Sequence, residues 1–334
     1  MHRKILLASS IALFIFSGCS SKQYYTPEET YNTSSSNMGD RIVHYSRDGA
    51  TLASGDILTK IERVHLKVQK GFHFINNTKT VALTADNYGK CYVIGKQGVV
   101  DTIQFPQALL AGTITGKFLV YLLQNNSFGV YDLQKKSIIY SSKAQKAYAI
   151  DTRVANPLKI DDLVVIPTLD GKLTILNLKT LKVSKEMYVS TQSYLNNIIF
   201  LGRLNNTLIA STQNKVLSIS NKGKKELSMG ISEVIVNDNR EIYIFAKDGR
   251  ILKVDESLSI QSEKKFKFAH FSVATVYKNR VYALDKQGYL IVSNDSFSKY
   301  RVYKVEEVEG KSFISNGKLY YNQQIIDLNT LTYK

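Results

Sequence analysis

The sequence predicts an all-β protein, and a recurring pattern of strands and turns carries this prediction. From Arg41 to Lys334, short runs rich in Val, Ile, Leu, Tyr and Phe alternate with polar turns that contain Gly, Asp or Asn. No long stretch shows helical periodicity. Asp-Gly and Gln-Gly turns between apolar runs are typical of antiparallel hairpins. We therefore expect antiparallel sheets throughout this region.

The pattern repeats along the chain. The clearest copies begin at Asp161, Asn239 and Lys278, and weaker copies begin near Arg41, Thr80, Gly116, Asn205 and Asn316. The expected central turns lie about 40 residues apart, at Gly49, Gly89, Gly129, Gly171, Asn214, Gly249 and Gly288. This period fits a four-stranded blade. The sequence predicts one β-propeller of eight blades, with seven as the alternative, over residues 41–334.

Closure of such a ring requires both ends of the chain. An open ring would leave the faces of the first and last blades in water, so we expect the two ends of the domain to meet. A β-sandwich and an open β-solenoid are the alternative folds.

The first 18 residues have the organisation of a secretory signal. His2, Arg3 and Lys4 form a basic start, and an apolar segment of about a dozen residues follows from Ile5 to Phe16. That segment is shorter than the roughly 18 apolar residues that a membrane-spanning helix needs. It is expected to be removed from the mature protein.

The signal ends in a motif that resembles the lipobox of bacterial lipoproteins, Phe16-Ser17-Gly18-Cys19, in which Phe16 stands where leucine is usual. The resemblance implies cleavage between Gly18 and Cys19, and acylation of Cys19 by chains of the palmitate type. Ser20 follows in place of the aspartate that usually retains lipoproteins at the inner membrane. By that resemblance the protein is anchored to the outer membrane and faces the periplasm. An ordinary signal peptide with a chance cysteine is the alternative.

Residues 19–40 are predicted to be a flexible, lipid-anchored tether. The segment is rich in Ser, Thr, Asn, Tyr and charged residues and has no continuous apolar face, so burial cannot offset the entropy lost on ordering. The predicted domains are thus residues 1–18, 19–40 and 41–334.

Three segments resemble the repeat of quinoprotein-type (PQQ-like) propellers, namely VYDLQKKSIIY from Val130, ILNLKTLKV from Ile175 and IIDLNTLTY from Ile325. That repeat usually ends in a tryptophan, whereas this chain has none. Together with the lipobox, the repeat is similar to the BamB-like lipoproteins of outer-membrane assembly. This resemblance implies a scaffold that binds the outer-membrane barrel insertase. It assigns no partner-binding residue here.

Two other functions remain as alternatives: an envelope propeller that binds a ligand or glycan, and a quinoprotein-type enzyme. Against the enzyme, the chain lacks both the tryptophan and the adjacent cysteines that hold the quinone in that family. We therefore expect no catalytic residue, no cofactor and no metal site. Cys91 is expected to be a small buried apolar residue. The histidines are expected to occupy turns and the surface, and they are His44, His65, His73 and His270.

The formal net charge is +16, and it falls to +14 without the signal. Lysines outnumber arginines 34 to 10 and are scattered through turns, whereas proteins that read bases concentrate arginine on one element. We expect a solvated, lysine-rich surface and no nucleic-acid partner. Such a surface can also attract anionic lipid or an acidic protein.

Overall fold

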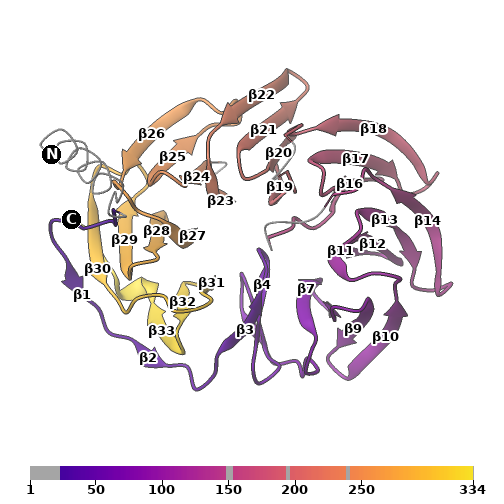
Figure 1. The fold of residues 1–334 in the computed structure, drawn as a ribbon, viewed down its shortest axis with the longest axis horizontal. Helices are drawn as coiled ribbons and strands as arrows, with labels where there is room; N and C mark the ends of the chain where they lie inside the picture. The colour runs from indigo at the N-terminus through magenta and orange to yellow at the C-terminus, as the bar shows by residue number, and fades with distance from the viewer. Residues whose placement is uncertain (1–22, 148–152, 193–195, 238–240, 334) are drawn as a thin grey trace, which may run out of the picture.

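The computed structural model describes residues 23–147, 153–192, 196–237 and 241–333, which form a ring of eight β-sheets (Figure 1). The prediction of an all-β propeller with eight four-stranded antiparallel blades is confirmed. The predicted signal peptide (residues 1–18) and the predicted lipidation site, Cys19, lie outside the described residues.

Each blade is a meander whose first strand lines the centre of the ring and whose last strand lies at the rim (Figure 1). Blades 1 to 4 consist of β3 (Ile42–Tyr45), β4 (Gly49–Leu52), β5 (Ile57–Thr59) and β6 (Arg63–Val64); β7 (His73–Asn77), β8 (Val81–Ala85), β9 (Lys90–Gly95) and β10 (Gly98–Gln104); β11 (Leu109–Thr115), β12 (Phe118–Leu123), β13 (Ser127–Asp132) and β14 (Ser137–Lys143); and β15 (Leu158–Ile160), β16 (Leu163–Pro167), β17 (Lys172–Asn177) and β18 (Lys182–Tyr188).

The second half of the ring repeats this arrangement. Blades 5 to 8 consist of β19 (Phe200–Leu204), β20 (Thr207–Ser211), β21 (Lys215–Ser220) and β22 (Gly223–Ser228); β23 (Ile231–Val236), β24 (Ile242–Ala246), β25 (Arg250–Val254) and β26 (Ile260–Lys265); β27 (Phe271–Tyr277), β28 (Arg280–Asp285), β29 (Tyr289–Asn294) and β30 (Tyr300–Lys304); and β31 (Phe313–Ser315), β32 (Lys318–Tyr321) and β33 (Gln324–Asp327), followed by the 3₁₀ turn η1 (Leu328–Thr330).

The core is divided among the interfaces between neighbouring blades. Eight clusters of buried apolar side chains occur, one at each interface around the ring. The second strands are therefore buried on both faces, as in β24, where all five residues are buried. The rim strands face water, as in β22, where five of six residues are exposed.

Aromatic side chains fill these interfaces in the absence of tryptophan. Tyr243 and Tyr282, which were expected at blade interfaces, are buried. Phe105 of blade 2 contacts Tyr121 of blade 3 with 4.5 Å between ring centres. Each such ring buries a large apolar area, so several Phe and Tyr residues can serve where other propellers use one tryptophan.

One hydrogen bond recurs in blades 1 to 7. The residue at the turn between the second and third strands accepts, through its carbonyl, a hydrogen bond from the backbone N–H of the residue at which the chain leaves the rim strand. The pairs are Gly55 with Val68, Gly89 with Phe105, Asn126 with Ala144, Gly171 with Val189, Asn214 with Met229, Gly249 with Phe266 and Gly288 with Val305, at 2.8–3.2 Å. We call this contact the turn clamp.

The turn clamp corrects two of the predicted landmarks. Gly49 and Gly129 lie within β4 and β13, and the equivalent turns are made by Gly55 and Asn126. Both turn residues have positive φ, 90° for Gly55 and 64° for Asn126. Asparagine tolerates this left-handed conformation better than most residues, so blade 3 needs no glycine there.

Two segments of the expected tether add strands to the ring, which differs from the prediction of a flexible linker. β1 (Tyr31–Asn32) pairs in parallel with β30, and β2 (Ser36–Asn37) pairs with β33 and so becomes the fourth strand of blade 8. The expected closure of the ring by both ends of the chain is confirmed, because β2 from the beginning pairs with β33 near the end. Each strand is only two residues long, so its sequence shows no period.

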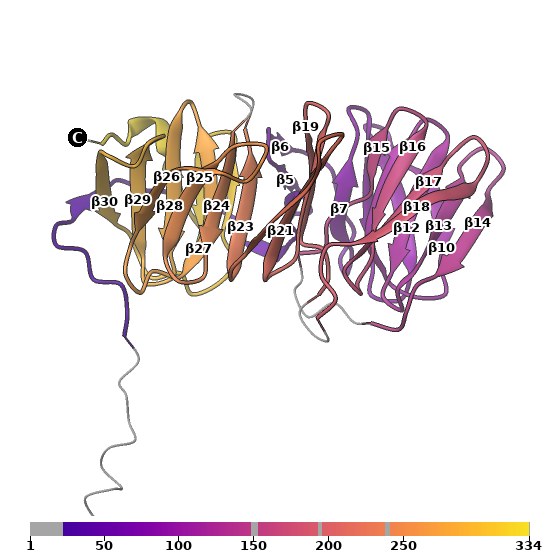
Figure 2. The same ribbon diagram turned by 90° about the horizontal axis from the view of Figure 1, so that it is seen from above.

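Tyr25 also holds this segment against the ring. It is 8% exposed and packs edge-on against Phe266 and Tyr289, with ring centres 6.1 and 5.7 Å away. The burial of this ring helps to offset the entropy lost when the segment is ordered. The side view in Figure 2 shows β1 beside the outer edge of β30.

The turn clamp predicts that Gly249→Ala destabilises the fold more than Gly223→Ala. Both glycines have positive φ, so alanine costs about 1–2 kcal/mol at either position. At Gly249 the new Cβ would also lie 2.1 Å from the carbonyl oxygen of Phe266, whereas nothing lies within 4 Å at Gly223. We expect a further loss of about 1–3 kcal/mol in the free energy of unfolding for Gly249→Ala, measured by urea denaturation. Equal losses would show that the close approach does not limit stability.

Candidate binding site in the central channel

The innermost strands surround a central channel that contains two cavities of about 550 and 570 Å³. The described residues that line one cavity are all different from those that line the other. Both volumes fall in the range of small-molecule sites, roughly 300–1,000 Å³. We call them the Arg47 cavity and the Arg153 cavity after one cationic residue in each.

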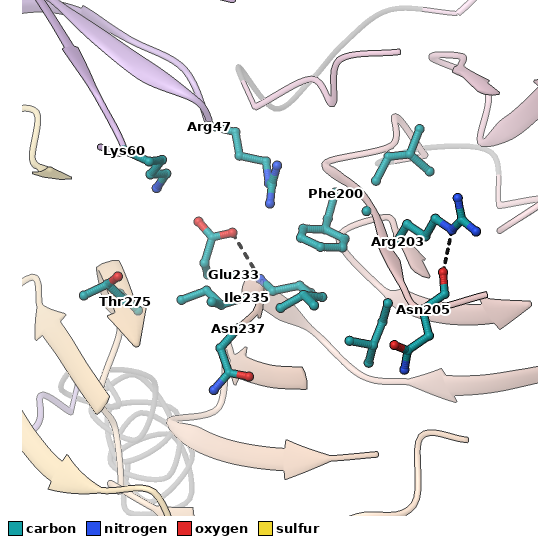
Figure 3. A pocket seen from close by; sticks show the side chains of 15 residues that line it. Arg47, Lys60, Phe200, Arg203, Asn205, Glu233, Ile235, Asn237 and Thr275 are labelled. Carbon is teal, nitrogen blue, oxygen red and sulfur yellow. Dashed lines mark hydrogen bonds between the residues drawn. The ribbon is translucent and has the colours of Figure 1, made fainter. Parts of the chain in front are cut away.

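The Arg47 cavity lies between blade 1 and blades 5 to 7. Arg47 and Lys60 project from blade 1, Phe200 from β19 and Glu233 from β23 (Figure 3). The Arg47 guanidinium lies 4.2 Å from the centre of the Phe200 ring, so a cation–π contact joins blades 1 and 5 across the channel. Arg203 lines the same cavity.

A set of polar contacts holds the Arg47 turn in place. Asp48 pairs with Arg47 at 3.1 Å and accepts a hydrogen bond from the Asn156 amide at 2.7 Å. The Asn156 side chain also accepts from the N–H of Gly112 at 2.9 Å. Because Asn156 begins blade 4 and Gly112 lies in blade 3, these bonds connect the turn of blade 1 to blades 3 and 4.

Lys60, which also lines this cavity, has a lowered pKa. It keeps contact with solvent, but protein atoms crowd its ammonium group, and this burial lowers the pKa of Lys60. Arg47 lowers the pKa further, while Glu233 and Asp48 oppose the shift. The Lys60 ammonium lies 4.8 Å from the centre of the Phe313 ring. An anion in this cavity would stabilise the charged form of Lys60.

The Arg153 cavity is lined by four basic side chains, Arg153, Lys247, His270 and Lys286. Arg153 donates to the backbone carbonyl of Ser232, and the Lys247 ammonium donates to the amide oxygen of Gln213 at 2.7 Å. Four hydroxyl-bearing residues also line the cavity, namely Tyr45, Ser232, Ser272 and Ser312, and Phe271, Val308 and Gly310 complete the described lining.

Two histidines meet although they are 29 residues apart in the chain. His44 on β3 and His73 on β7 stack with ring centres 4.1 Å apart, and both are half-buried. Their expected place on the surface is therefore wrong, because neighbouring inner strands bring them together. His65 and His270 are exposed, as expected.

Burial lowers the pKa of His44 to about 4, and the neighbouring His73 and Lys311 add to this shift. Burial also lowers the pKa of His73, against the attraction of Asp86. The His44 Nδ1 atom is buried and has no hydrogen-bond partner among the described residues. The folded state thus favours the neutral form of both rings near pH 7.

Cys91 is fully buried on β9, at 0% exposure, which confirms the expectation for this residue. Burial raises the pKa of its thiol to about 12. In the part of the chain that the structure describes, no group of three or more His, Cys, Asp or Glu side chains is placed to hold a metal ion. No helix among the described residues has the length and apolar character of a membrane span.

Comparison with protein-family models gives no match. The plasminogen-binding protein PgbB of Helicobacter pylori, in strains J99 and 26695, is 25% identical to this chain over 98% of the chain and 71% of PgbB. BamB from Moraxella catarrhalis has a similar structure, with a TM-score of 0.64 and 12% identity over 87% of this chain and 98% of BamB.

The same fold occurs in a protein of different origin. The C-terminal WD40 domain of Sif2 matches with a TM-score of 0.65 and 9% identity over 89% of this chain and 98% of that domain. Because these identities are low, the similarity of this chain to BamB and to Sif2 shows a shared fold. The resemblance to the BamB-like propeller is thus supported at the level of the fold, while the PQQ-like repeat finds no matching family model.

The His44 pKa predicts a loss of stability in acid. The folded pKa of about 4 lies below the unfolded value near 6.5. The free energy of unfolding that depends on neutral His44 is therefore fully present above pH 6.5 and is lost as the pH falls towards 4. Relative to His44→Gln, the native protein should lose about 2 kcal/mol of unfolding free energy across this range, a value discounted for the partial exposure of the ring. Urea titrations at several pH values test this. His65→Gln serves as the exposed control, and parallel curves for the native protein and His44→Gln would contradict the assignment.

Proposed function

We propose that this protein is a lipid-anchored scaffold of the bacterial envelope that binds other proteins, and that it acts in the assembly of outer-membrane β-barrels. The observation that carries the proposal is the single eight-bladed ring, whose fold BamB shares, joined to the lipobox that ends at Cys19. The relative PgbB, which matches 98% of this chain, is a plasminogen-binding protein and thus also binds a protein.

An apolar groove between blades 1 and 2 offers a surface for such a partner. The cavity measures about 520 Å³ and is lined by apolar side chains of both blades, including Ile57, Val64, Phe74 and Val81. Ile61 at its edge is 78% exposed. An exposed apolar surface with charged residues nearby is typical of a protein contact. Glu62, Lys79 and Lys96 supply those charges.

The groove exists because blade 1 is short. Its strands contain four, four, three and two residues, whereas those of blade 2 contain five, five, six and seven. Blade 1 therefore cannot cover the facing sheet completely. Only four buried side chains form the cluster at this interface.

Site-specific crosslinking tests the partner. A photo-reactive amino acid at Ile61, in the full-length protein in its native envelope, should capture the periplasmic part of the barrel insertase. The same group at Ile138, an exposed isoleucine on β14, should not. Ile61→Asp should reduce co-purification of the insertase at least fivefold, and Ile138→Asp should leave it unchanged. The role in assembly would be overturned if the group at Ile61, like the one at Ile138, captured no insertase while the insertase was recovered with its other subunits.

Plasminogen binding is a second candidate, favoured by the match to PgbB over nearly the whole chain. The two functions differ in the side of the membrane that the propeller faces. Purified plasminogen added to intact cells should bind, and binding should depend on this protein, only if the propeller is displayed outside. Binding that appears only after permeabilisation would leave the periplasm-facing scaffold as the better account.

The anchor is tested independently through Cys19→Ser. Because acylation requires the thiol, this variant should incorporate no labelled palmitate and should remain as an uncleaved precursor. Fractionation and the mobility of the precursor on gels measure both effects. Ser20→Ala is the matched control and should be processed normally. Acylation of Cys19→Ser would contradict the lipobox assignment.

A further inference from the structure

The cations of the Arg153 cavity come together because the repeat places equivalent residues side by side. Lys247 and Lys286 both follow the second strand of their blade, directly before the turn-clamp segments that contain Gly249 and Gly288. The backbone N–H of each donates to the carbonyl of the residue just before the inner strand, Gly230 or His270. Adjacent blades 6 and 7 therefore each place a lysine at the same edge of the channel.

The serines of this cavity follow the same rule. Ser232, Ser272 and Ser312 stand at or next to the first position of the inner strands β23, β27 and β31, in three successive blades. The Ser272 hydroxyl donates to the carbonyl of Leu284 at 3.1 Å, so the serine donors for an anion are Ser232 and Ser312. Blades 6 and 7 thus combine hydroxyl groups with basic side chains, and blade 8 adds a hydroxyl group. Phosphate oxygens accept hydrogen bonds from both kinds of group.

The described carboxylates near the cavity are directed elsewhere. Asp285 precedes Lys286 but is fully buried, and it accepts hydrogen bonds from the backbone N–H groups of His270 at 2.6 Å and Gln287 at 2.8 Å. Glu233 follows Ser232 but lines the Arg47 cavity (Figure 3). Lys286 forms no ion pair with the described residues.

The acidic loop between β30 and β31 contributes uncharged residues to the described lining. Val308 and Gly310 line the cavity, whereas Glu306, Glu307 and Glu309 do not, and these three residues are exposed. The described lining therefore contains basic and hydroxyl groups without a carboxylate. Lys247, His270 and Lys286 are exposed, so an anion in solution can reach the cavity.

We infer that the Arg153 cavity binds a compact oligophosphate, with Lys286, Lys247 and Arg153 as its cationic ligands and the hydroxyls of Ser232 and Ser312 as further donors. The positive lining holds the anion by charge-assisted hydrogen bonds, which are strongest where the site is partly shielded from water. The site is separate from the groove between blades 1 and 2, so a test of phosphate binding does not depend on the protein partner proposed above.

Sodium tripolyphosphate is a suitable probe, and calorimetric titration of the full-length protein in detergent measures its binding. Lys286→Gln should weaken binding at least tenfold, and Lys247→Gln/Lys286→Gln should weaken it further. Lys286→Arg, which keeps the charge, should retain binding within about threefold. The matched control Lys224→Gln/Lys225→Gln removes two exposed charges from β22 and should change binding less than twofold.

Two results would overturn the inference: no binding of tripolyphosphate by the native protein at millimolar concentration in low salt, or an equal loss in the β22 control, which would indicate diffuse attraction to a lysine-rich surface. Thermal unfolding of each variant without the probe establishes that it folds. Vesicles that contain phosphatidylglycerol separate the sources of phosphate. Lipid binding should not depend on Lys286, whereas a tenfold dependence together with no binding of tripolyphosphate would assign the site to a lipid headgroup instead.

Discussion

The turn clamp is the contact on which the ring depends. In seven blades the carbonyl of a turn residue holds the backbone at the point where the chain leaves the rim and crosses to the next inner strand. The geometry is tight, because a Cβ at Gly89, Gly249 or Gly288 would lie 2.4, 2.1 or 2.6 Å from a backbone oxygen. Each crossing therefore has one defined path, and each blade begins in the same relation to the one before it.

Closure solves a problem that the clamp alone leaves open. Blade 8 has three strands, β31 to β33, from the end of the described chain, and β2 supplies the fourth. This pairing satisfies an edge that would otherwise expose unpaired N–H and carbonyl groups. Two short polar strands and one buried tyrosine, Tyr25, thus join the beginning of the described chain to blades 7 and 8.

The sequence predicts the repeated parts well and the irregular parts poorly, for physical reasons. Strand and turn chemistry recurs about every 40 residues, so the all-β class, the blade count and the buried tyrosines can be read from it. β1 and β2 cannot, because their strand conformation comes from the edges that they join. The stack of His44 on His73 and the grouping of Lys247 with Lys286 arise from the ring. In sequence these lysines look like all the other turn lysines.

Regular blades leave little room for function, because both faces of every sheet are used in packing against neighbours. Surfaces that can bind another molecule arise where a blade has short strands or where residues of a blade face the channel. Blade 1 does both: its short strands uncover the groove beside Ile61, and its turn brings Arg47 across the channel to Phe200. The channel cations repel one another, and water reduces this cost without removing it. The same ring that packs apolar side chains between neighbouring blades thus brings basic side chains to its centre, where a small anion can offset their charge.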